Sequence, residues 1–200
     1  MAENGLASHL EQVVRDAKQT LDALGYEWAL VGGLAVSARS EPRFTRDVDL
    51  AVKVGGDREA EALIRELQQS GYRILTVLEQ ETSDRLATIR LLPSGADEHG
   101  VILDLLFASS GIEPEIVLSA SVIEAFPDLE VPVASLGHLL AVKILARDDE
   151  RRPQDAIDIR ALVKEATEGD LATAKRSAAL IMERGFHRNR DLLAELEKAL

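Results

Sequence analysis

Cysteine is absent from the 200-residue chain, which excludes disulfide bonds and metal sites built from thiolates. Long apolar runs are absent too: the run at 101–108 is interrupted by Asp104 and is far too short to cross a bilayer. The first residues lack the basic and apolar regions of a signal peptide. We therefore expect a cytoplasmic protein without membrane contact.

An excess of positive charge is also lacking, because 35 acids outnumber 23 bases and the formal net charge is −12. Proteins that bind nucleic acid unspecifically usually carry basic surfaces that displace counterions, so the charge argues against that class. A local basic cleft stays compatible with it, and the acidity would suit a small cationic substrate. With 46% hydrophobic and 29% charged residues, the composition is typical of an ordinary globular protein.

Two aspartates stand two residues apart in the stretch 47–54. If this stretch is a strand, Val48, Leu50 and Val52 face the core, and Asp47 and Asp49 share the opposite face. Their Cα atoms then lie roughly 6.6 Å apart, at about 3.3 Å per residue. Carboxylates at that spacing can hold one hard cation or bridge two. Such a pair is often merely solvated, so it is a weak signal alone.

A glycine pair, Gly32 and Gly33, separates the predicted strand 27–31 from the predicted helix 33–39. Glycine lets the backbone turn tightly and approach a ligand closely. The free N–H groups at the start of the helix would suit a phosphate. Gly-Gly turns are common, so the prediction of a binding site depends on the combination with the acids.

Asp104 is embedded in the stretch 101–107, which is apolar on both faces and therefore predicts a central strand. An ionised carboxylate in such a strand is costly unless it is paired or bound to a metal. A salt bridge to a buried arginine would satisfy it. We favour the alternative, in which Asp104 lies beside the strand 47–53 and completes a carboxylate triad.

Together, Gly32-Gly33-Leu34-Ala35 and Arg43-x-Thr45-x-Asp47-x-Asp49-Leu50 resemble the nucleotidyltransferase signature in its AbiEii-like form. That branch includes MenT-like toxins of bacterial toxin–antitoxin pairs, and Gly-Gly in place of the more general Gly-Ser favours it. The resemblance implies that the glycine turn holds the phosphates of an NTP. It also implies that Asp47 and Asp49 bind Mg²⁺ or Mn²⁺, and that Asp104 is the third catalytic acid, which touches one metal.

Three arginines, Arg39, Arg43 and Arg46, cluster before Asp47. They could contact triphosphate oxygens, although arginines that flank acids are often their solvated partners. We include Arg46 among the predicted nucleotide-binding residues.

From residue 135 onward the pattern is helical, with Ser135 as a predicted N-cap. Lys143 shares a face with Leu136 and Leu140 and should point inward, where it could snorkel or reach a phosphate. A larger set, Lys143, Arg147, Arg152, Asp155 and Asp158, resembles the lysine, arginine and Lys-Asp-x-x-Asp arrangement of the AbiEii-like toxins. The resemblance implies phosphate contacts for Lys143 and Arg152 and a catalytic role for Asp155. Gln154 departs from it, because the family usually has lysine there.

The predicted fold class is α/β (α+β): a nucleotidyltransferase fold with a mixed β-sheet flanked by helices, followed by a helical C-terminal part. We expect the boundary between residues 1–134 and residues 135–200. The predicted strands are 27–31, 47–54, 72–78, 86–92, 101–107, 122–126 and 129–133.

The predicted activity is metal-dependent transfer of NMP from an NTP to a hydroxyl acceptor. By the resemblance, the acceptor is an RNA such as a tRNA 3′ end, and an antitoxin protein is a partner. One alternative is a nucleotidyltransferase for a small cationic antibiotic, for which a cleft with excess acids would be diagnostic. Another is a non-catalytic nucleotide-binding relative.

Overall fold

Seven strands form one mixed sheet in the order β3-β4-β5-β2-β1-β7-β6 in a computed structural model, which describes residues 2–79, 85–96 and 100–200. The strands are β1 (Trp28–Val31), β2 (Asp47–Val52), β3 (Arg73–Glu79), β4 (Leu86–Leu92), β5 (Ile102–Leu106), β6 (Ser121–Phe126) and β7 (Leu129–Val133). Parallel pairing joins β2 to β5 and β1 to β7, and the other neighbours are antiparallel. The expected mixed sheet is confirmed.

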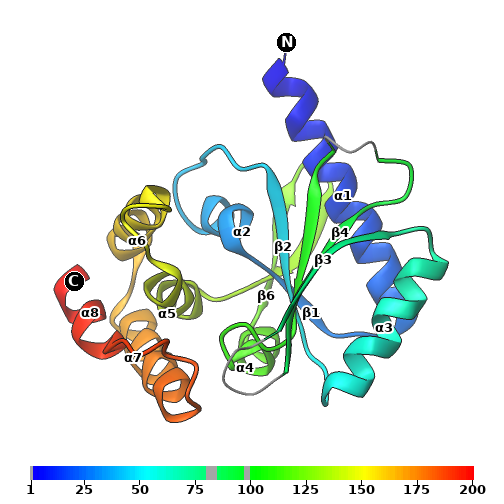
Figure 1. The fold of residues 1–200 in the computed structure, drawn as a ribbon. Coiled ribbons are helices and arrows are strands. Elements are labelled where there is room, and N and C mark those ends of the chain that lie inside the picture. The colour runs from blue at the N-terminus through cyan, green and yellow to red at the C-terminus, as the bar shows by residue number, and fades with distance from the viewer. Residues whose placement is uncertain (1, 80–84, 97–99) are drawn as a thin grey trace.

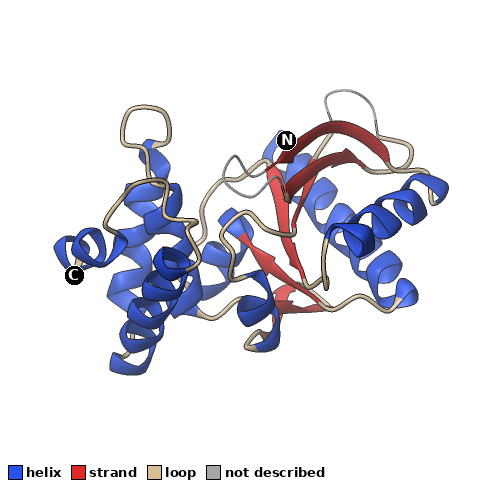
Figure 2. Cartoon of the chain, turned by 60° about the horizontal axis from the view of Figure 1, so that its bottom comes forward, coloured by secondary structure: helices blue, strands red, loops and turns tan. Residues whose placement is uncertain are grey.

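The helices of the described residues are α1 (Ala2–Leu24), α2 (Gly32–Arg39), α3 (Asp57–Gln69), α4 (Glu113–Leu118), α5 (Leu136–Ala146), α6 (Pro153–Glu165), α7 (Glu168–Glu183) and α8 (Leu192–Ala199). Figure 1 shows α1 and α3 along one side of the sheet and α5 to α8 grouped on the other, beyond α2. In Figure 2 this group of helices, which includes the C-terminus, stands beside the strands. The described helices include none that is long and apolar enough to cross a membrane.

The two faces of β2 differ as the alternation predicts. Val48, Leu50 and Val52 are fully buried in the core, which α1 helps to cover. Asp47 and Asp49 line a cleft instead. Burial of three branched apolar side chains fixes the register of the strand, because a slip by one residue would bring the carboxylates into the core. The hydrophobic effect on one face therefore orients the acids on the other.

The order of the strands gathers the sequence motifs in the middle of the sheet. The third strand in this order is β5, which pairs with β2, so the predicted central strand is confirmed. On its other side β2 pairs with β1, and Val31 lies opposite Asp49. The glycine turn that follows Val31 is thereby delivered to the end of β2 where the acids lie.

Helix capping marks the change to the helical part. Ser135 caps α5 by accepting a hydrogen bond from the backbone N–H of His138, as predicted. Residues 134–200 are all described and contain no strand. Asp191 caps α8, because its side chain accepts a hydrogen bond from the N–H of Ala194 at 3.0 Å.

Candidate functional site

Both glycines of the turn are required by close packing. Gly32, the first residue of α2, has φ +63, a conformation that favours glycine. A Cβ on Gly32 would lie 1.9 Å from Asp49 Oδ2, and one on Gly33 would lie 2.6 Å from Arg43 Nη2 and 2.8 Å from Thr45 Oγ1. The Asp49 carboxylate therefore lies directly against the backbone of the turn, in space that a side chain would fill.

Register brings the three predicted acids together. β2 and β5 are parallel, with Asp49 paired to Asp104 and Asp47 to Ile102. Side chains at paired positions of neighbouring strands lie on the same face, so Asp104 joins Asp47 and Asp49 at the cleft. Asp104 is 7% exposed.

The salt bridge considered for Asp104 is also present. Arg90 of β4 lies opposite Asp104. Its guanidinium group makes a bidentate contact, donating from Nε to Oδ1 at 2.9 Å and from Nη2 to Oδ2 at 2.7 Å. The arginine is not buried, because 43% of its side chain is exposed. The hydrogen bond to Asp104 raises the pKa of Arg90. Asp104 thus lies beside β2, as predicted, and its salt bridge is made with a partly exposed arginine instead of the buried one considered.

The other two acids are poorly compensated. Burial, followed by the charge of Asp104, raises the pKa of Asp49 to about 6. Burial is also the main cause of a raised pKa at Asp47, with Asp104 adding to it and Arg90 opposing it. Carboxylates that resist ionisation side by side need positive charge, so this donor set fits a hard divalent cation. Within the described ranges, no three acidic or histidine side chains yet converge as a complete ion site.

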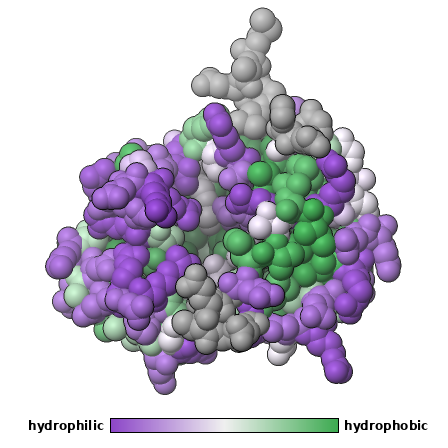
Figure 3. Space-filling view, in the orientation of Figure 1, coloured by the Kyte–Doolittle hydropathy of each residue, from purple (hydrophilic) through white to green (hydrophobic). Residues whose placement is uncertain are grey.

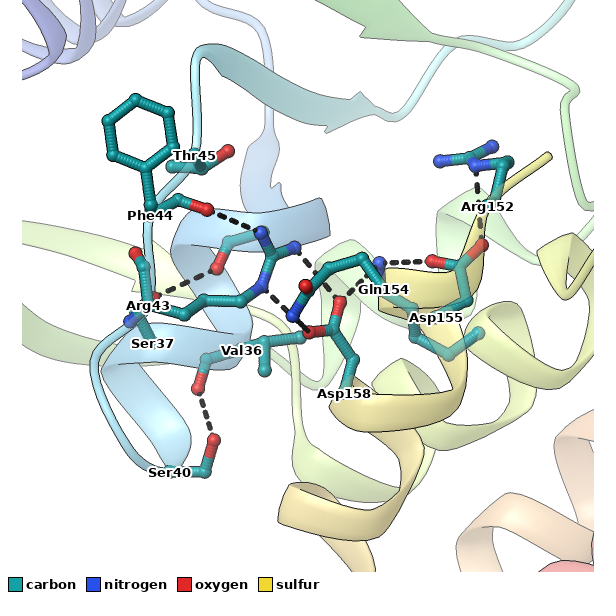
Figure 4. A network of polar contacts seen from close by, with 12 residues as sticks. Val36, Ser37, Ser40, Arg43, Phe44, Thr45, Arg152, Gln154, Asp155 and Asp158 are labelled. Atoms are coloured by element: carbon teal, nitrogen blue, oxygen red, sulfur yellow. Dashed lines mark hydrogen bonds and ion pairs between the residues drawn. The ribbon is translucent and has the colours of Figure 1, made fainter. Parts of the chain in front are cut away.

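The opposite wall of the cleft is helical and balanced in charge. Lys143 of α5 is buried, and its Nζ lies 2.8 Å from Asp155 Oδ1 and 2.8 Å from Asp158 Oδ2. Arg43 pairs with the fully buried Asp158 through Nε at 2.7 Å and Nη2 at 2.9 Å. Figure 4 shows this network between the loop before β2 and the start of α6. Lys143 points inward as predicted, towards these two carboxylates.

Two further residues complete this wall. Arg152 Nε lies 3.2 Å from Asp155 Oδ2, and 60% of the arginine side chain stays exposed. Gln154, at the position where a lysine was expected, donates from Nε2 to Asp158 Oδ1 at 3.2 Å. A neutral amide suffices there because Asp158 already has two cationic partners.

Two arginines that the sequence associated with the site do not line it. Arg147 follows the end of α5. Its guanidinium group donates to the carboxylate of Asp149, from Nε to Oδ1 at 2.7 Å and from Nη2 to Oδ2 at 2.8 Å. Arg39 ties α2 to the sheet by donating to the carbonyls of Ala134 and Val133. Arg147 therefore lies outside the cleft that Lys143 and Arg152 line, although its position in the sequence suits the pattern.

The cleft between the two walls has a volume of about 810 Å³. Its lining includes every predicted site residue: Gly32, Gly33, Arg46, Asp47, Asp49, Asp104, Lys143, Arg152 and Asp155. Among the residues that the structure describes, seven bases line it, namely Arg43, Arg46, Arg90, Lys143, Arg151, Arg152 and Arg188, against five acids, namely Asp47, Asp49, Asp104, Glu113 and Asp155. The balance is the reverse of the whole chain, with 23 bases and 35 acids. The cleft therefore favours an anionic ligand.

Sequence reasoning missed several lining residues, above all Arg90, Phe44 and Arg188. Arg90 carried a signal, because it is the only charged residue in the apolar stretch 86–92 and alternation places it on the face of Thr88. Arg188 lies in the turn before α8. Its approach to the cleft depends on how the last helices pack, and no local pattern reveals that.

A family model identifies the family of the chain, and a solved structure shares its fold. The family model described as "Nucleotidyl transferase AbiEii toxin, Type IV TA system" matches residues 18–200. An antigenic nucleotidyltransferase-like protein from Paracoccidioides brasiliensis is 19% identical with a TM-score of 0.58, covering 95% of this chain and 93% of its own. A nucleotidyltransferase-like fold is thereby shown.

Two weaker structural likenesses have TM-scores below 0.5. The putative nucleotidyltransferase from H. pylori is 15% identical with a TM-score of 0.48, covering 98% of this chain and 91% of its own. The antibiotic-resistance factor ANT(2'')-Ia is 17% identical with a TM-score of 0.48, covering 94% and 90%. No curated protein matches the sequence significantly.

Proposed function

Because the chain belongs to the AbiEii nucleotidyltransferase toxin family, we propose that it moves NMP from an NTP to a hydroxyl group of an acceptor, using a divalent cation. The observation that carries this is the register of β2 with β5, which sets Asp49 beside Asp104 next to the glycine turn. Three acids on one face of the sheet, with bases across the cleft, are the feature that we weigh against the non-catalytic alternative.

Asp47, Asp49 and Asp104 would hold Mg²⁺ or Mn²⁺. When bound, such a cation neutralises the charge of the triphosphate and of the reacting oxygens. The raised pKa of Asp49 is in keeping with this assignment, since desolvation and then the charge of Asp104 disfavour its ionised form, which a bound cation would stabilise. Arg90 would continue to pair with Asp104 or turn towards the phosphates, because it lies at the cleft and is partly exposed.

The triphosphate would lie between the two walls. Gly32 and Gly33 open α2, whose first N–H groups have no partner within the helix and suit an anion. Across the cleft, two donors of the Lys143 ammonium bind acids and one is left for a phosphate oxygen. Arg152 and Arg46 are exposed at the cleft and can turn towards the phosphates.

Asp155 was expected to be catalytic, and its contacts support a positioning role within the proposed site. It is 2% exposed and binds both Lys143 and Arg152. Holding two cations at fixed positions before the substrate arrives lowers the cost of ordering them. Residues 1–134 would thus contribute the acids, and residues 135–200 would contribute Lys143 and Arg152 with the acids that orient them.

The acceptor is proposed to be an RNA such as a tRNA 3′ end. Supporting this, the described part of the cleft lining has seven bases and five acids, whereas a small cationic acceptor would favour the opposite balance. An antitoxin partner is expected from the toxin–antitoxin family to which the chain belongs. A cytoplasmic location stays a prediction.

The test is label transfer. We would incubate the protein with Mg²⁺, total bacterial RNA and each of four α-labelled NTPs, with the Asp49→Asn variant as control. Labelled RNA from the unaltered protein alone is the expected result, and the labelled band gives the acceptor. Transfer only to an added aminoglycoside would contradict the RNA proposal, and equal transfer by Asp49→Asn would contradict the proposed metal site.

A further inference from the structure

Phe44 differs from the other aromatic residues of this chain, of which there are four Phe, two Tyr and one Trp. Trp28, Tyr72, Phe107 and Phe186 are buried, and Tyr26 and Phe126 are partly buried against the core. Phe44 is 58% exposed and lines the cleft. A large apolar ring held in water forgoes the free energy of burial, so its position calls for an explanation by binding.

The backbone below this ring is firmly held. The N–H of Arg43 donates to Ser37 Oγ at 3.2 Å, and Arg43 Nη1 donates to the carbonyl of Phe44 at 2.9 Å. The same guanidinium pairs with the buried Asp158. Figure 4 shows the Phe44 ring pointing away from this network. The loop thus presents the ring in a preorganised position, which reduces the entropy lost on binding.

Arg46 places a positive charge beside the ring of Phe44. Its guanidinium carbon lies 5.5 Å from the centroid of Phe44, within the range of a cation–π contact. The ring keeps most of its exposure despite this neighbour, so a flat surface stays open for a ligand. An aromatic ring together with an arginine plane is the arrangement that proteins use to stack unpaired bases.

The location also suits a base. Phe44 precedes Asp47 by three residues, so their Cα atoms lie within about 11 Å even if the chain is fully extended. A nucleotide is roughly that size, and a base on Phe44 could therefore belong to a nucleotide whose phosphate or hydroxyl lies at the acids. An apolar protein segment would suit the ring less well, because it would bury the charges of Arg46 and Arg43 beside it.

We propose that Phe44 and Arg46 form a stacking site for a nucleobase. The proposal rests on the proposed nucleotidyl transfer and adds a place for one of its two substrates. The base comes either from the NTP or from the unpaired 3′ end of the acceptor strand. The stacking chemistry is the same for both sources, so the experiment has to separate them.

The test uses 2-aminopurine, whose fluorescence is quenched when it stacks. One probe is 2-aminopurine riboside triphosphate, and the other is a single-stranded oligoribonucleotide with 2-aminopurine at its 3′ end. Each is titrated with the unaltered protein, Phe44→Leu, Phe44→Trp and Leu118→Ala. Leu118 is a matched control, since it is 65% exposed and does not line the cleft. Thermal unfolding checks that Phe44→Leu folds normally, as its exposure predicts.

We expect one of the two probes to be quenched by the unaltered protein, by Phe44→Trp and by Leu118→Ala. Phe44→Leu should lose the quenching and bind that probe about 5- to 150-fold more weakly, as removal of one stacking contact predicts. Quenching of the triphosphate assigns the site to the NTP, and quenching of the oligonucleotide assigns it to the acceptor. Binding without quenching, no binding of either probe, or an unchanged affinity of Phe44→Leu would overturn the proposal.

Failure of this proposal is distinguishable from failure of the proposed function. Label transfer with unchanged KM values for NTP and RNA in Phe44→Leu would reject the stacking site and leave the transfer reaction standing. If quenching depends on Phe44 but the protein transfers no label, the stacking site stands and the transfer reaction is rejected.

Discussion

The two walls of the cleft contain acids of opposite character. On the sheet, Asp47 and Asp49 are half-buried, and their pKa values are raised mainly by desolvation, with the charge of Asp104 adding to it. On the helical wall, Asp155 and Asp158 each bind two cationic side chains. The acids on the sheet therefore lack cationic partners of their own except for Asp104, whereas both acids on the helical wall are paired without a ligand.

This difference separates function from stability. A buried carboxylate that is fully paired supports the fold, and removing it leaves its partners uncompensated. A buried carboxylate that lacks a partner costs folding free energy, and a bound cation can recover that cost. Natural active sites often accept such a cost, because the strain is released by the ligand. The comparison therefore predicts that equal substitutions on the two walls have unequal effects.

The largest effect is expected for Asp49→Asn on the sheet wall. The amide keeps the shape but removes a ligand charge, so transfer should fall by about 10³-fold or more, the equivalent of several kcal/mol of charge stabilisation. The unfolding free energy should stay equal or rise, because a poorly compensated charge is removed. Initial rates of label transfer and urea unfolding measure the two. Asp149→Asn, outside the cleft, is the control, and a stable but equally active Asp49→Asn would break the comparison.

Asp158→Ala should show the opposite balance, with stability as its main effect. Its carboxylate is fully buried and binds Arg43 and Lys143. Removal leaves both cations without that partner, and we expect a loss of about 3–5 kcal/mol in the free energy of unfolding. Urea unfolding at neutral pH measures it. Glu41→Ala breaks an exposed pair with Lys164 and should leave the urea midpoint unchanged. If Asp158→Ala also left the urea midpoint unchanged, the ion-pair network would not be needed for stability.

The pH dependence of stability should carry the signature of Asp49. Its pKa is about 6 in the folded protein and 3.8 as an ordinary value, so between these values the folded state holds the proton more tightly than the unfolded one. Without cation, stability contributed by this group therefore increases as pH falls from about 6 to about 4, on the order of 1 to 2 kcal/mol. The measurement is the difference in urea midpoint between the unaltered protein and Asp49→Asn across that range. A constant difference would contradict it.

The smallest effect is expected for Gln154→Lys, which restores the residue usual in the family. Asp158 already has two cationic partners, and Gln154 is exposed at the edge of the cleft. A further cation there should change the unfolding free energy by less than about 1 kcal/mol and the transfer rate by only a few-fold. A gain of transfer of 100-fold would show that the helical wall, too, lacks a charge that the substrate needs.

Much of this arrangement could be predicted from local patterns. Alternation in 47–52 placed Asp47 and Asp49 opposite the buried Val48 and Leu50, and each predicted strand and helix is present. These predictions hold because periodicity and capping depend on neighbours in the chain. The placement of every predicted site residue at one cleft follows from them together with the family resemblance; their chemical roles stay proposals.

The partners of the acids could not be predicted in the same way. The pair of Arg90 with Asp104 depends on the register of β4 with β5. The pair of Arg43 with Asp158 spans 115 residues and depends on where α6 packs. Phe44 looks like an ordinary loop residue in the sequence, and its exposure appears only when the hydrogen bonds of Arg43 are known. Apolar side chains are exposed as well: Leu75 and Val77 lie on β3, a strand at the edge of the sheet, and are 45% and 48% exposed. Figure 3 shows hydrophobic surface on the right of this view, beside the hydrophilic helical part on the left.

The bond between Arg43 and Asp158 also has a temporal consequence. During synthesis on a ribosome, Asp47, Asp49 and Asp104 emerge before Lys143, Arg152 and Asp158. When the last strand of the sheet has been synthesised, Asp158, the partner of Arg43 that lies 115 residues further along the chain, has not yet been made. The helical wall of the cleft is absent from such a fragment, so the cleft gains its second wall only after α5 and α6 have been synthesised.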